Sequence, residues 1–334
     1  MAATPTPRPT RASPSGNPAL AALQGLALRL PAAVAFSGGA DSTALLMAAR
    51  EVWPGRIRAI HVHHGLQLRA DDFARHCQAL CDELDVPFHT VRVQARHGAG
   101  ESPEDAARKV RYLALAQTAA SLGVQSVLLG HHADDQAETL LLALSRGAGL
   151  PGLAAMPDCF ERHGMSFRRP LLGIAAKSLR EWLAGQGVAI IDDLTNADTA
   201  FTRNRIRHAI LPALEAAFPQ FRETFARSAR HAAQAQELLV ELAASDLSLV
   251  GNPPAIAQLR RLTRARQANL LRHWLRTACD VAASTAQMEE LLDQVEACAT
   301  RGHAIRIKVA AGRVELHQGV LRYVTSTQDR PAGA

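Results

Sequence analysis

Short apolar runs alternate with longer amphipathic stretches over the first two thirds of the chain. Apolar runs bounded by turn residues are typical of buried strands. They occur at 32–35, 56–64, 87–93, 125–130 and 187–191, with a further strand-like segment at 167–172. Helical composition fills the intervals at 43–49 and 71–84, and again after Ser102, where a proline and two acids mark a helix start. Strands that alternate with helices predict a doubly wound parallel α/β sheet.

The pattern changes after residue 212, where long helical stretches replace the alternation. We expect helices at 221–247, 256–277 and 285–298, and then strands at 304–309, 313–317 and 320–324. The second of these helices is amphipathic and basic, with arginines at Arg260, Arg261, Arg264, Arg266, Arg272 and Arg276. The sequence therefore predicts a flexible tail at 1–18, an α/β domain at 19–212 and a mainly helical domain at 213–334.

Composition narrows the class of protein. Hydrophobic residues make up 48% of the 334 residues and charged residues 20%, which is ordinary for a globular protein with two cores. No apolar run reaches membrane-spanning length, and the tail lacks the apolar segment of a signal peptide. We therefore expect a cytoplasmic protein without a membrane partner.

The five cysteines are odd in number, scattered, and contain no Cys-x-x-Cys pair. Cys77 and Cys81 lie four residues apart in a helical stretch, where buried thiols are the simplest interpretation. We expect no zinc, no iron–sulfur cluster and no disulfide.

The charge balance favours an acidic partner. Lys and Arg total 37 against 31 Asp and Glu, which gives a net charge of +6, and only three of the 37 are lysines. A surplus carried by arginine suits a nucleic acid, although charge alone does not establish one.

The loop after the first strand carries the clearest chemistry. Residues 37–42 read Ser-Gly-Gly-Ala-Asp-Ser and lead into a helix. Gly38 and Gly39 allow close backbone approach, so consecutive N–H groups and the helix N-terminus can bind phosphate. The loop is neither a Walker loop nor a dinucleotide-binding loop. It resembles the loop of ATP pyrophosphatases, although a Ser/Gly turn before a helix also occurs without function.

A second cluster follows the fourth strand. His131 and His132 precede Asp134, Asp135 and Glu138, and the spacing gathers the three carboxylates on one side of a helix start. Such a cluster can hold magnesium or receive a cationic amine. Each acidic residue near a helix N-terminus also stabilises the helix by about 0.3–1 kcal/mol, which is the structural alternative to a functional role. Three acids beside two histidines at the end of a strand are more than helix stabilisation requires.

Basic residues gather in two further places. One set lies at Arg203, Asn204, Arg205 and Arg207, and the other at Arg108 and Arg111 on one helix face with Glu104. The first suits phosphate or RNA contact. For both sets, a solvated surface of charged residues is the alternative interpretation.

Together these residues resemble the tRNA(Ile)-lysidine synthetase family of the PP-loop ATP pyrophosphatase superfamily. The motifs are 37–42 (SGGADS), 61–66 (HVHHGL), 104–112 (EDAARKVRY), 132–139 (HADDQAET), 146–149 (RGAG), 152–156 (GLAAM), 169–172 (RPLL), 193–196 (DLTN), and Arg203, Asn204 and Arg207. Only the first motif is shared with other ATP pyrophosphatases, so the set in this order is specific.

The resemblance implies a Rossmann-like PP-loop catalytic domain followed by a tRNA-binding domain. It implies ligation of lysine to carbon 2 of the wobble cytidine of CAU-anticodon tRNA(Ile), with ATP and magnesium as cofactors and AMP and pyrophosphate as products. The modified tRNA would read AUA as isoleucine. Longer relatives carry a further C-terminal domain that we expect this chain to lack, and the resemblance leaves open whether the protein is a homodimer.

The resemblance also implies roles for individual residues. Asp41, Asp135 and Glu138 would be catalytic. The ATP site would comprise Ser37, Gly38, Gly39, Ala40, Asp41, Ser42, His63 and His132. Asp134, Arg108 and Arg111 are candidates for contact with lysine or ATP, Asp41 and Asp134 for magnesium, and Arg203, Asn204, Arg205 and Arg207 for tRNA.

Two other functions compete. A tRNA thiolase of the same superfamily would need cysteines near the site to carry sulfur. A catalytically silent nucleotide-binding or RNA-binding module would not need Asp41 and Glu138. The residues present favour the ligase over both.

Overall fold

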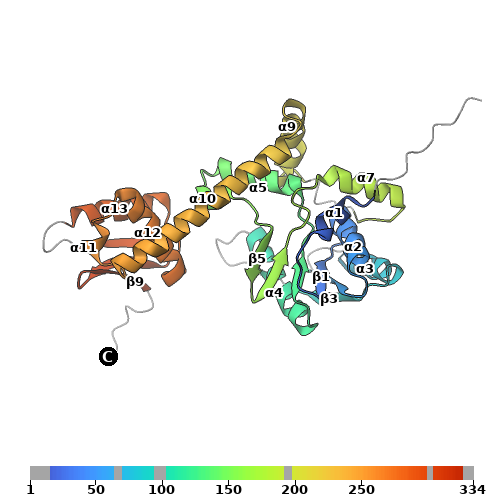
Figure 1. Cartoon of the computed structure of the whole chain (residues 1–334), viewed down its shortest axis with the longest axis horizontal. Coiled ribbons are helices and arrows are strands. Elements are labelled where there is room, and N and C mark those ends of the chain that lie inside the picture. Colours follow the sequence, from blue (N-terminus) through green and yellow to red (C-terminus); the bar gives the residue numbers. More distant parts are fainter. Residues whose placement is uncertain (1–15, 64–69, 94–102, 192–197, 299–303, 326–334) are drawn as a thin grey trace, which may run out of the picture. The chain divides into compact units, whose positions relative to one another are not determined.

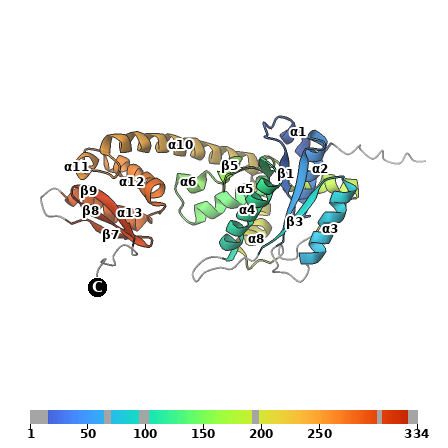
Figure 2. The same ribbon diagram turned by 90° about the horizontal axis from the view of Figure 1, so that it is seen from below.

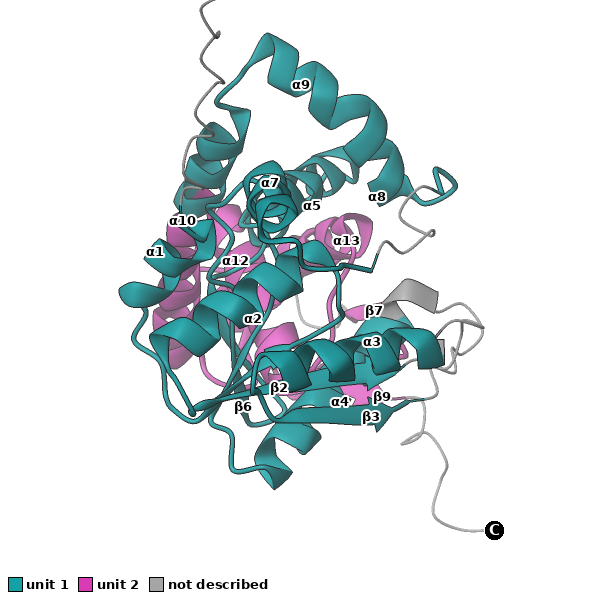
Figure 3. Ribbon diagram, turned by 90° about the vertical axis from the view of Figure 1, so that its right-hand side faces the viewer, with its two compact units in different colours: residues 1–231 teal, residues 232–334 magenta. Residues whose placement is uncertain are grey.

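The computed structural model describes residues 16–63, 70–93, 103–191, 198–298 and 304–325. The chain forms two compact units, residues 1–231 and 232–334, which Figure 3 distinguishes by colour.

Unit 1 contains a six-stranded sheet in the order β3-β2-β1-β4-β6-β5 (Figure 1). The strands are β1 (Ala32–Ala35), β2 (Ile57–His63), β3 (Phe88–Arg92), β4 (Ser126–Leu128), β5 (Cys159–Arg162) and β6 (Met165–Arg168). All neighbours pair in parallel except β5 and β6, which form an antiparallel hairpin at the edge. The doubly wound parallel sheet predicted from the sequence is confirmed.

Helices cover both faces of this sheet. They are α1 (Pro18–Gln24), α2 (Ala40–Val52), α3 (Ala70–Glu83), α4 (Pro103–Ser121), α5 (Ala133–Ser145), α6 (Leu150–Leu153) and α7 (Ala176–Gln186). Figure 2 shows β1 and β3 between α4 on one side and α2 and α3 on the other. The chain winds outward from β1 through β2 to β3 and then returns to β4 on the other side of β1, so the topological switch point lies between β1 and β4.

Alternation along the strands divides the core into two layers. Ala32 and Val34 of β1 pack with α1, α2, α3 and α7, whereas Ala33 packs with α4. This follows from the two-residue period of a strand. Cys77 and Cys81 of α3 lie in the first layer and are fully buried, and burial raises the pKa of both thiols to about 12. The prediction of buried thiols is confirmed.

One predicted strand is wrong. Residues 187–191 form no strand; the place next to β4 is taken by β6, and its partner β5 was not predicted. Val188, Ile190 and Ile191 pack on the core from outside the sheet, and Ile191 N donates to Gly38 O at 2.9 Å. The segment therefore supports the loop after β1 instead of extending the sheet.

A continuous helical segment follows the gap at 192–197. It comprises α8 (Thr202–Arg205), a π-helical turn, η2 (Ile206–Ile210), and α9 (Leu211–Ala217). Ile206 and Leu211 are buried with Ala137 of α5, and Phe221 at the start of α10 (Phe221–Val250) joins this cluster. The segment is thus packed directly on the helix that carries the acidic cluster.

Unit 2 contains the remainder of α10, α11 (Ile256–Leu259), α12 (Arg264–Cys279), α13 (Thr285–Ala297) and a sheet of β7 (Arg306–Val309), β8 (Gly312–His317) and β9 (Val320–Thr325). The predicted helix at 256–277 is wrong as a single element. It breaks because Thr263 adopts extended backbone with ψ 151° and Gln267 Nε2 donates to the Leu262 carbonyl. Within the described ranges, no helix has the length and apolar character needed to cross a bilayer.

Candidate active site

The loop after β1 is built around two glycines. Gly38 has φ +80°, and a Cβ there would lie 2.6 Å from Ile191 Cδ1 and 2.9 Å from Cys77 Sγ, so only glycine fits. Gly39 is the N-cap of α2 and Ala40 its first residue. The first N–H groups of a helix have no intrahelical partner, and here they face the switch point of the sheet.

Serine and threonine hydroxyls fix the shape of this loop. Ser37 Oγ and Ser42 Oγ lie 3.1 Å apart, and Ser42 Oγ donates to Gly39 O at 3.0 Å. Thr43 Oγ1 also donates to Gly39 O, at 2.9 Å. Because the hydroxyls hold the loop in one conformation, it is preorganised for a phosphate.

Gly130 brings the second cluster against this loop. A Cβ at Gly130 would lie 3.2 Å from Ser42 N, so glycine after β4 lets that strand end approach the start of α2. His132 then caps α5: Asp135 N donates to His132 Nδ1 at 3.3 Å, and His132 N donates to Asp135 Oδ2 at 3.1 Å. The loops after β1 and β4 therefore meet at the switch point of the sheet.

His132 connects the two loops chemically. Because Nδ1 accepts from Asp135, the ring proton lies on Nε2, which is 3.5 Å from Asp41 Oδ2. Burial lowers the pKa of His132, but the hydrogen bond to Asp41 and the charges of Asp135 and Asp41 outweigh burial and raise the pKa overall.

Asp134 is held by two donors from other elements. Arg222 Nε donates to Oδ1 at 2.7 Å, and Ala176 N, at the start of α7, donates to Oδ2 at 2.9 Å. Arg222 also pairs with Glu215 of α9. Burial raises the pKa of Asp134, but these two hydrogen bonds outweigh burial and lower the pKa overall. Asp134 therefore joins α5, α7 and α10.

Asp135 and Glu138 face one guanidinium. Arg207 Nε donates to Glu138 Oε1 at 2.7 Å, and Arg207 Nη2 donates to Asp135 Oδ1 at 3.0 Å. Glu138 is fully buried, and burial raises its pKa although Arg207 opposes the shift. Its other oxygen, Oε2, is buried and has no hydrogen-bond partner among the described residues.

Magnesium would fit beside Asp41. Asp41 Oδ1 is buried and, within the described part of the chain, also has no hydrogen-bond partner. The described residues contain no group of three or more His, Cys, Asp or Glu side chains able to hold a metal. The open oxygen of Asp41 suits magnesium, which usually takes one or two carboxylates and completes its shell with phosphate oxygens and water. The contacts of Asp134 make it the weaker of the two candidate ligands.

Arg108 and Arg111 belong to an arginine cluster around Tyr112. The guanidinium carbons of Arg108, Arg111 and Arg162 lie 5.9, 5.8 and 5.1 Å from the centroid of the Tyr112 ring. Arg169 Nη2 donates to Tyr112 Oη at 3.2 Å. Burial lowers the pKa of His131 to about 3, the charge of Asp135 opposes this, and the charges of Arg169, Arg111 and Arg108 add to it, so His131 is a neutral ring.

The other predicted ATP-site and tRNA-site residues are more dispersed. His63, at the end of β2, has Nε2 3.1 Å from Asp71 Oδ1. Arg203 Nη2 donates to Thr139 Oγ1 at 3.2 Å, so Arg203 and Arg207 both turn toward α5. Asn204 Nδ2 donates to Asp198 O, and Arg205 is exposed. Residues 64–66 and 193–196 of the sequence motifs, and the side chain of Glu104, lie outside the described residues.

Sequence reasoning missed three contributors to the site. Arg222, Arg162 and Arg169 each contact residues of the predicted clusters across long sequence separations. Arg169 belongs to the RPLL motif, which could have pointed to it. Arg222 has no local signal, because it lies among the charged residues of a long helix.

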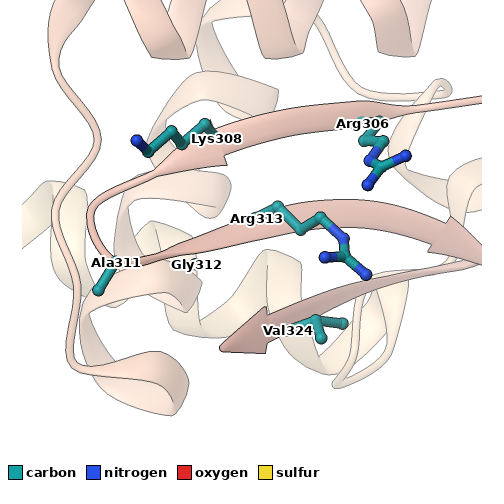
Figure 4. A pocket seen from close by; sticks show the side chains of 6 residues that line it. All are labelled: Arg306, Lys308, Ala311, Gly312, Arg313 and Val324. Carbon is teal, nitrogen blue, oxygen red and sulfur yellow. The ribbon is translucent and has the colours of Figure 1, made fainter. Parts of the chain in front are cut away.

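Unit 2 presents a basic hollow on its sheet. A cavity of about 410 Å³ is lined by Arg306, Lys308, Ala311, Gly312, Arg313 and Val324 (Figure 4). Arg306 and Lys308 are exposed on β7, and Arg313 of β8 lies opposite Lys308 and pairs with Glu315. In contrast, Arg264 of α12 is within ion-pair distance of Glu289, Asp293 and Glu296, and Arg266 pairs with buried Asp246.

Comparisons with known proteins identify the relatives of this chain. Residues 26–214, more than half of the chain, match the family model of the PP-loop domain, and residues 255–323 match the TilS substrate binding domain. A tRNA(Ile)-lysidine synthase from Polaromonas naphthalenivorans is 60% identical over 92% of this chain and 95% of its own length. One from Burkholderia mallei is 42% identical over 89% of this chain but only 62% of its own length.

A solved structure shares the fold of unit 1. The U34-tRNA thiolase NcsA from Methanococcus maripaludis, with its [4Fe-4S] cluster, matches with a TM-score of 0.52 and 16% identity over 60% of this chain and 71% of its own. At that identity the match supports the fold alone. The PP-loop family model and the 60% identity to the Polaromonas protein establish the family as well as the fold: this chain belongs to the tRNA(Ile)-lysidine synthase family.

Proposed function

We propose that this protein uses ATP to join lysine to carbon 2 of the wobble cytidine of tRNA(Ile) with a CAU anticodon, forming lysidine. The observation that carries the proposal is the meeting of the loop at 37–42 with the carboxylates of α5 at the switch point of the sheet. Membership of the tRNA(Ile)-lysidine synthase family supports the same reaction.

In the first half-reaction, the cytidine carbonyl oxygen attacks the α-phosphorus of ATP and pyrophosphate leaves. The N–H groups of Gly39, Ala40 and Asp41 would stabilise the charge on the leaving group, and the hydroxyls of Ser37 and Ser42, which bond within the loop, would hold the loop in place around it. Magnesium, bound through Asp41 Oδ1, would neutralise part of that charge. His132 would hold Asp41 in place by donating from Nε2.

In the second half-reaction, the lysine ε-amine displaces AMP from the adenylated cytidine. Its ammonium must first be bound and then lose a proton before it can attack. Asp135 and Glu138 supply negative charge that attracts the ammonium. Glu138 Oε2, which is buried and has no hydrogen-bond partner among the described residues, is free to accept a hydrogen bond from it. Because burial raises the pKa of Glu138, this carboxylate is suited to accept the proton.

The tRNA would be held by basic surfaces on both units. In unit 1, Arg205 is the exposed member of the set at 203–207. In unit 2, Arg306 and Lys308 of the hollow present cations to solvent, and phosphate contacts of this kind position a nucleic acid without reading its sequence.

The test is incubation of the purified protein with ATP, magnesium, labelled lysine and total tRNA. We expect label in one isoleucine-accepting tRNA, with one AMP and one pyrophosphate released per lysine joined. Release of ADP would remove the pyrophosphatase assignment, and sulfur transfer without lysine would indicate a thiolase. Binding of tRNA without pyrophosphate release would indicate a silent module. Sedimentation of the same preparation tests whether the protein is a homodimer.

A further inference from the structure

Arg207 lies in the carboxylate site and not on the outer surface. Its guanidinium bridges Glu138 Oε1 and Asp135 Oδ1, and its side chain is 27% exposed, against 14% for Asp135 and 0% for Glu138. With Nε and Nη2 committed to carboxylates, this guanidinium is poorly placed to make a bidentate contact with RNA phosphate.

The packing of the segment that carries Arg207 fixes this placement. Arg207 lies in the π turn η2, between the buried residues Ile206 and Leu211, which pack against Ala137 of α5. One turn earlier, Arg203 reaches Thr139 of the same helix. π turns occur frequently at functional sites. The contact between Arg207 and α5 is therefore part of the packing of this segment.

The bridge leaves one acceptor open. Arg207 occupies one oxygen of each carboxylate, so Glu138 is fixed in rotation while Oε2 stays buried and without a partner among the described residues. Asp135, Glu138 and the bridging Arg207 carry a net charge of −1 among themselves, so the bridge does not neutralise the two carboxylates; Arg203, the other nearby cation, donates to Thr139 Oγ1. A lysine ammonium at Oε2 would complete the balance without displacing Arg207.

We infer that Arg207 is a positioning residue for lysine: it holds Glu138 ionised and oriented so that Oε2 receives the lysine ammonium. This inference rests on the proposed function and assigns Arg207 to the amine, in place of the tRNA contact expected from the sequence. The charged groups that act on Glu138 are Arg207 from η2, Arg203 from α8 and Asp135 from α5. Of these, Arg207 donates a hydrogen bond to the Glu138 carboxylate and opposes the effect of burial most strongly.

The test measures the lysine KM as a function of pH for the wild type, Arg207→Gln and Arg207→Lys, at saturating ATP and tRNA. In the wild type, the lysine KM should rise as the pH falls and Glu138 takes up a proton. In Arg207→Gln the charge that opposes burial is lost, so this rise should begin at higher pH. The lysine KM at neutral pH should increase roughly tenfold or more, as for loss of one charge-assisted hydrogen bond. Arg207→Lys should restore part of the profile.

Arg205→Gln is the matched variant, because Arg205 lies two residues away on the same segment but is exposed. It should reduce the salt dependence of tRNA binding and leave the lysine profile unchanged. The inference is overturned if Arg207→Gln instead lowers the salt slope by roughly 0.7–0.9 with an unchanged lysine profile, as for a phosphate contact. A lower Tm with an unchanged profile would also overturn it. A wild type that joins no lysine would overturn the proposed function itself, which is a separate result.

Discussion

His132 Nε2 lies 3.5 Å from Asp41 Oδ2, while Nδ1 of the same ring caps α5. Asparagine is a strong N-cap residue, so His132→Asn should keep the cap but lose the contact with Asp41. We expect His132→Asn to retain the wild-type Tm and to slow adenylation of tRNA. His132→Ala should slow adenylation equally and also lose about 1 kcal/mol of stability. Wild-type adenylation in His132→Asn would show that the contact with Asp41 is dispensable.

Gly38 and Gly39 should respond differently to an added methyl group. Gly38→Ala combines φ +80° with contacts of 2.6 and 2.9 Å, so its Tm and its ATP affinity should both fall. At Gly39 the nearest atom is Ser37 Oγ at 3.5 Å, which is ordinary contact. Gly39→Ala should therefore keep its Tm and raise only the KM for ATP. Calorimetry and ATP titration measure the two effects, and an equal Tm for both variants would contradict this account of Gly38.

The contact between Asp134 and Arg222 should stabilise the fold more than it serves magnesium. Arg222→Gln should cost about 1.5–3 kcal/mol, the range for a hydrogen bond to a charged group, and leave the magnesium requirement unchanged. The partners of Asp134 lower its pKa in the folded protein below the ordinary value of 3.8. The stability that the ionised carboxylate contributes is therefore present above pH 3.8 and is lost as the pH falls through the pKa of Asp134 in the folded protein. Unfolding curves of the two proteins should therefore converge in acid. A higher magnesium requirement with an unchanged Tm would indicate that Asp134 binds magnesium instead.

Glu138→Gln should separate the two half-reactions. The variant keeps the shape of the side chain and removes the charge that attracts lysine, so adenylated tRNA should accumulate while transfer of lysine is blocked. Because burial raises the pKa of Glu138, the fold loses stability as the pH rises through that pKa and the carboxyl ionises. The Tm of Glu138→Gln at neutral pH should therefore equal or exceed that of the wild type. Loss of adenylation would assign Glu138 to ATP and magnesium instead.

The basic hollow of unit 2 should contribute to tRNA binding through charge alone. Arg306→Ala and Lys308→Ala should each lower the salt slope of tRNA binding by roughly 0.7–0.9. Arg264→Ala is the control within the same unit, because Arg264 faces three acidic side chains and should leave the slope unchanged. Filter binding at several salt concentrations measures all three slopes. A smaller salt slope for Arg264→Ala and an unchanged slope for Arg306→Ala and Lys308→Ala would indicate that the tRNA contacts α12 instead.

The sheet was predictable because local signals agreed with the fold. The run at 32–35, the glycines after it and the acids after 130 each lie where a parallel sheet places ligand loops. The prediction failed at 187–191, where an apolar run packs on the core without pairing in the sheet. Apolar composition indicates that a segment is buried. It does not show whether the backbone N–H and C=O groups of the segment bond to a neighbouring strand.

The roles of the charged residues were less predictable than their presence. Arg207 was expected to contact RNA because it lies in a basic run, yet its partners come from a helix 69 and 72 residues earlier in the chain. Arg222 is similar, since its bond to Asp134 spans 88 residues. Spacing along one helix can be read from sequence, whereas contacts between distant segments depend on the packing that brings them together.

The π turn at Ile206–Ile210 gives this segment one residue more than an α-helix needs to make one turn. Its N–H to C=O bond from Leu211 to Ile206 spans one residue more than an α-helical bond does. Deleting one residue inside the turn, such as Ala209, would let an ordinary α-helical bond join the same two residues, so Ile206 and Leu211 would stay on the face that packs on α5. Deleting a residue of α9 instead would rotate the residues after it by about 100° relative to those before it. Natural variation here should accordingly accept single-residue deletions inside the π turn and exclude them from α9.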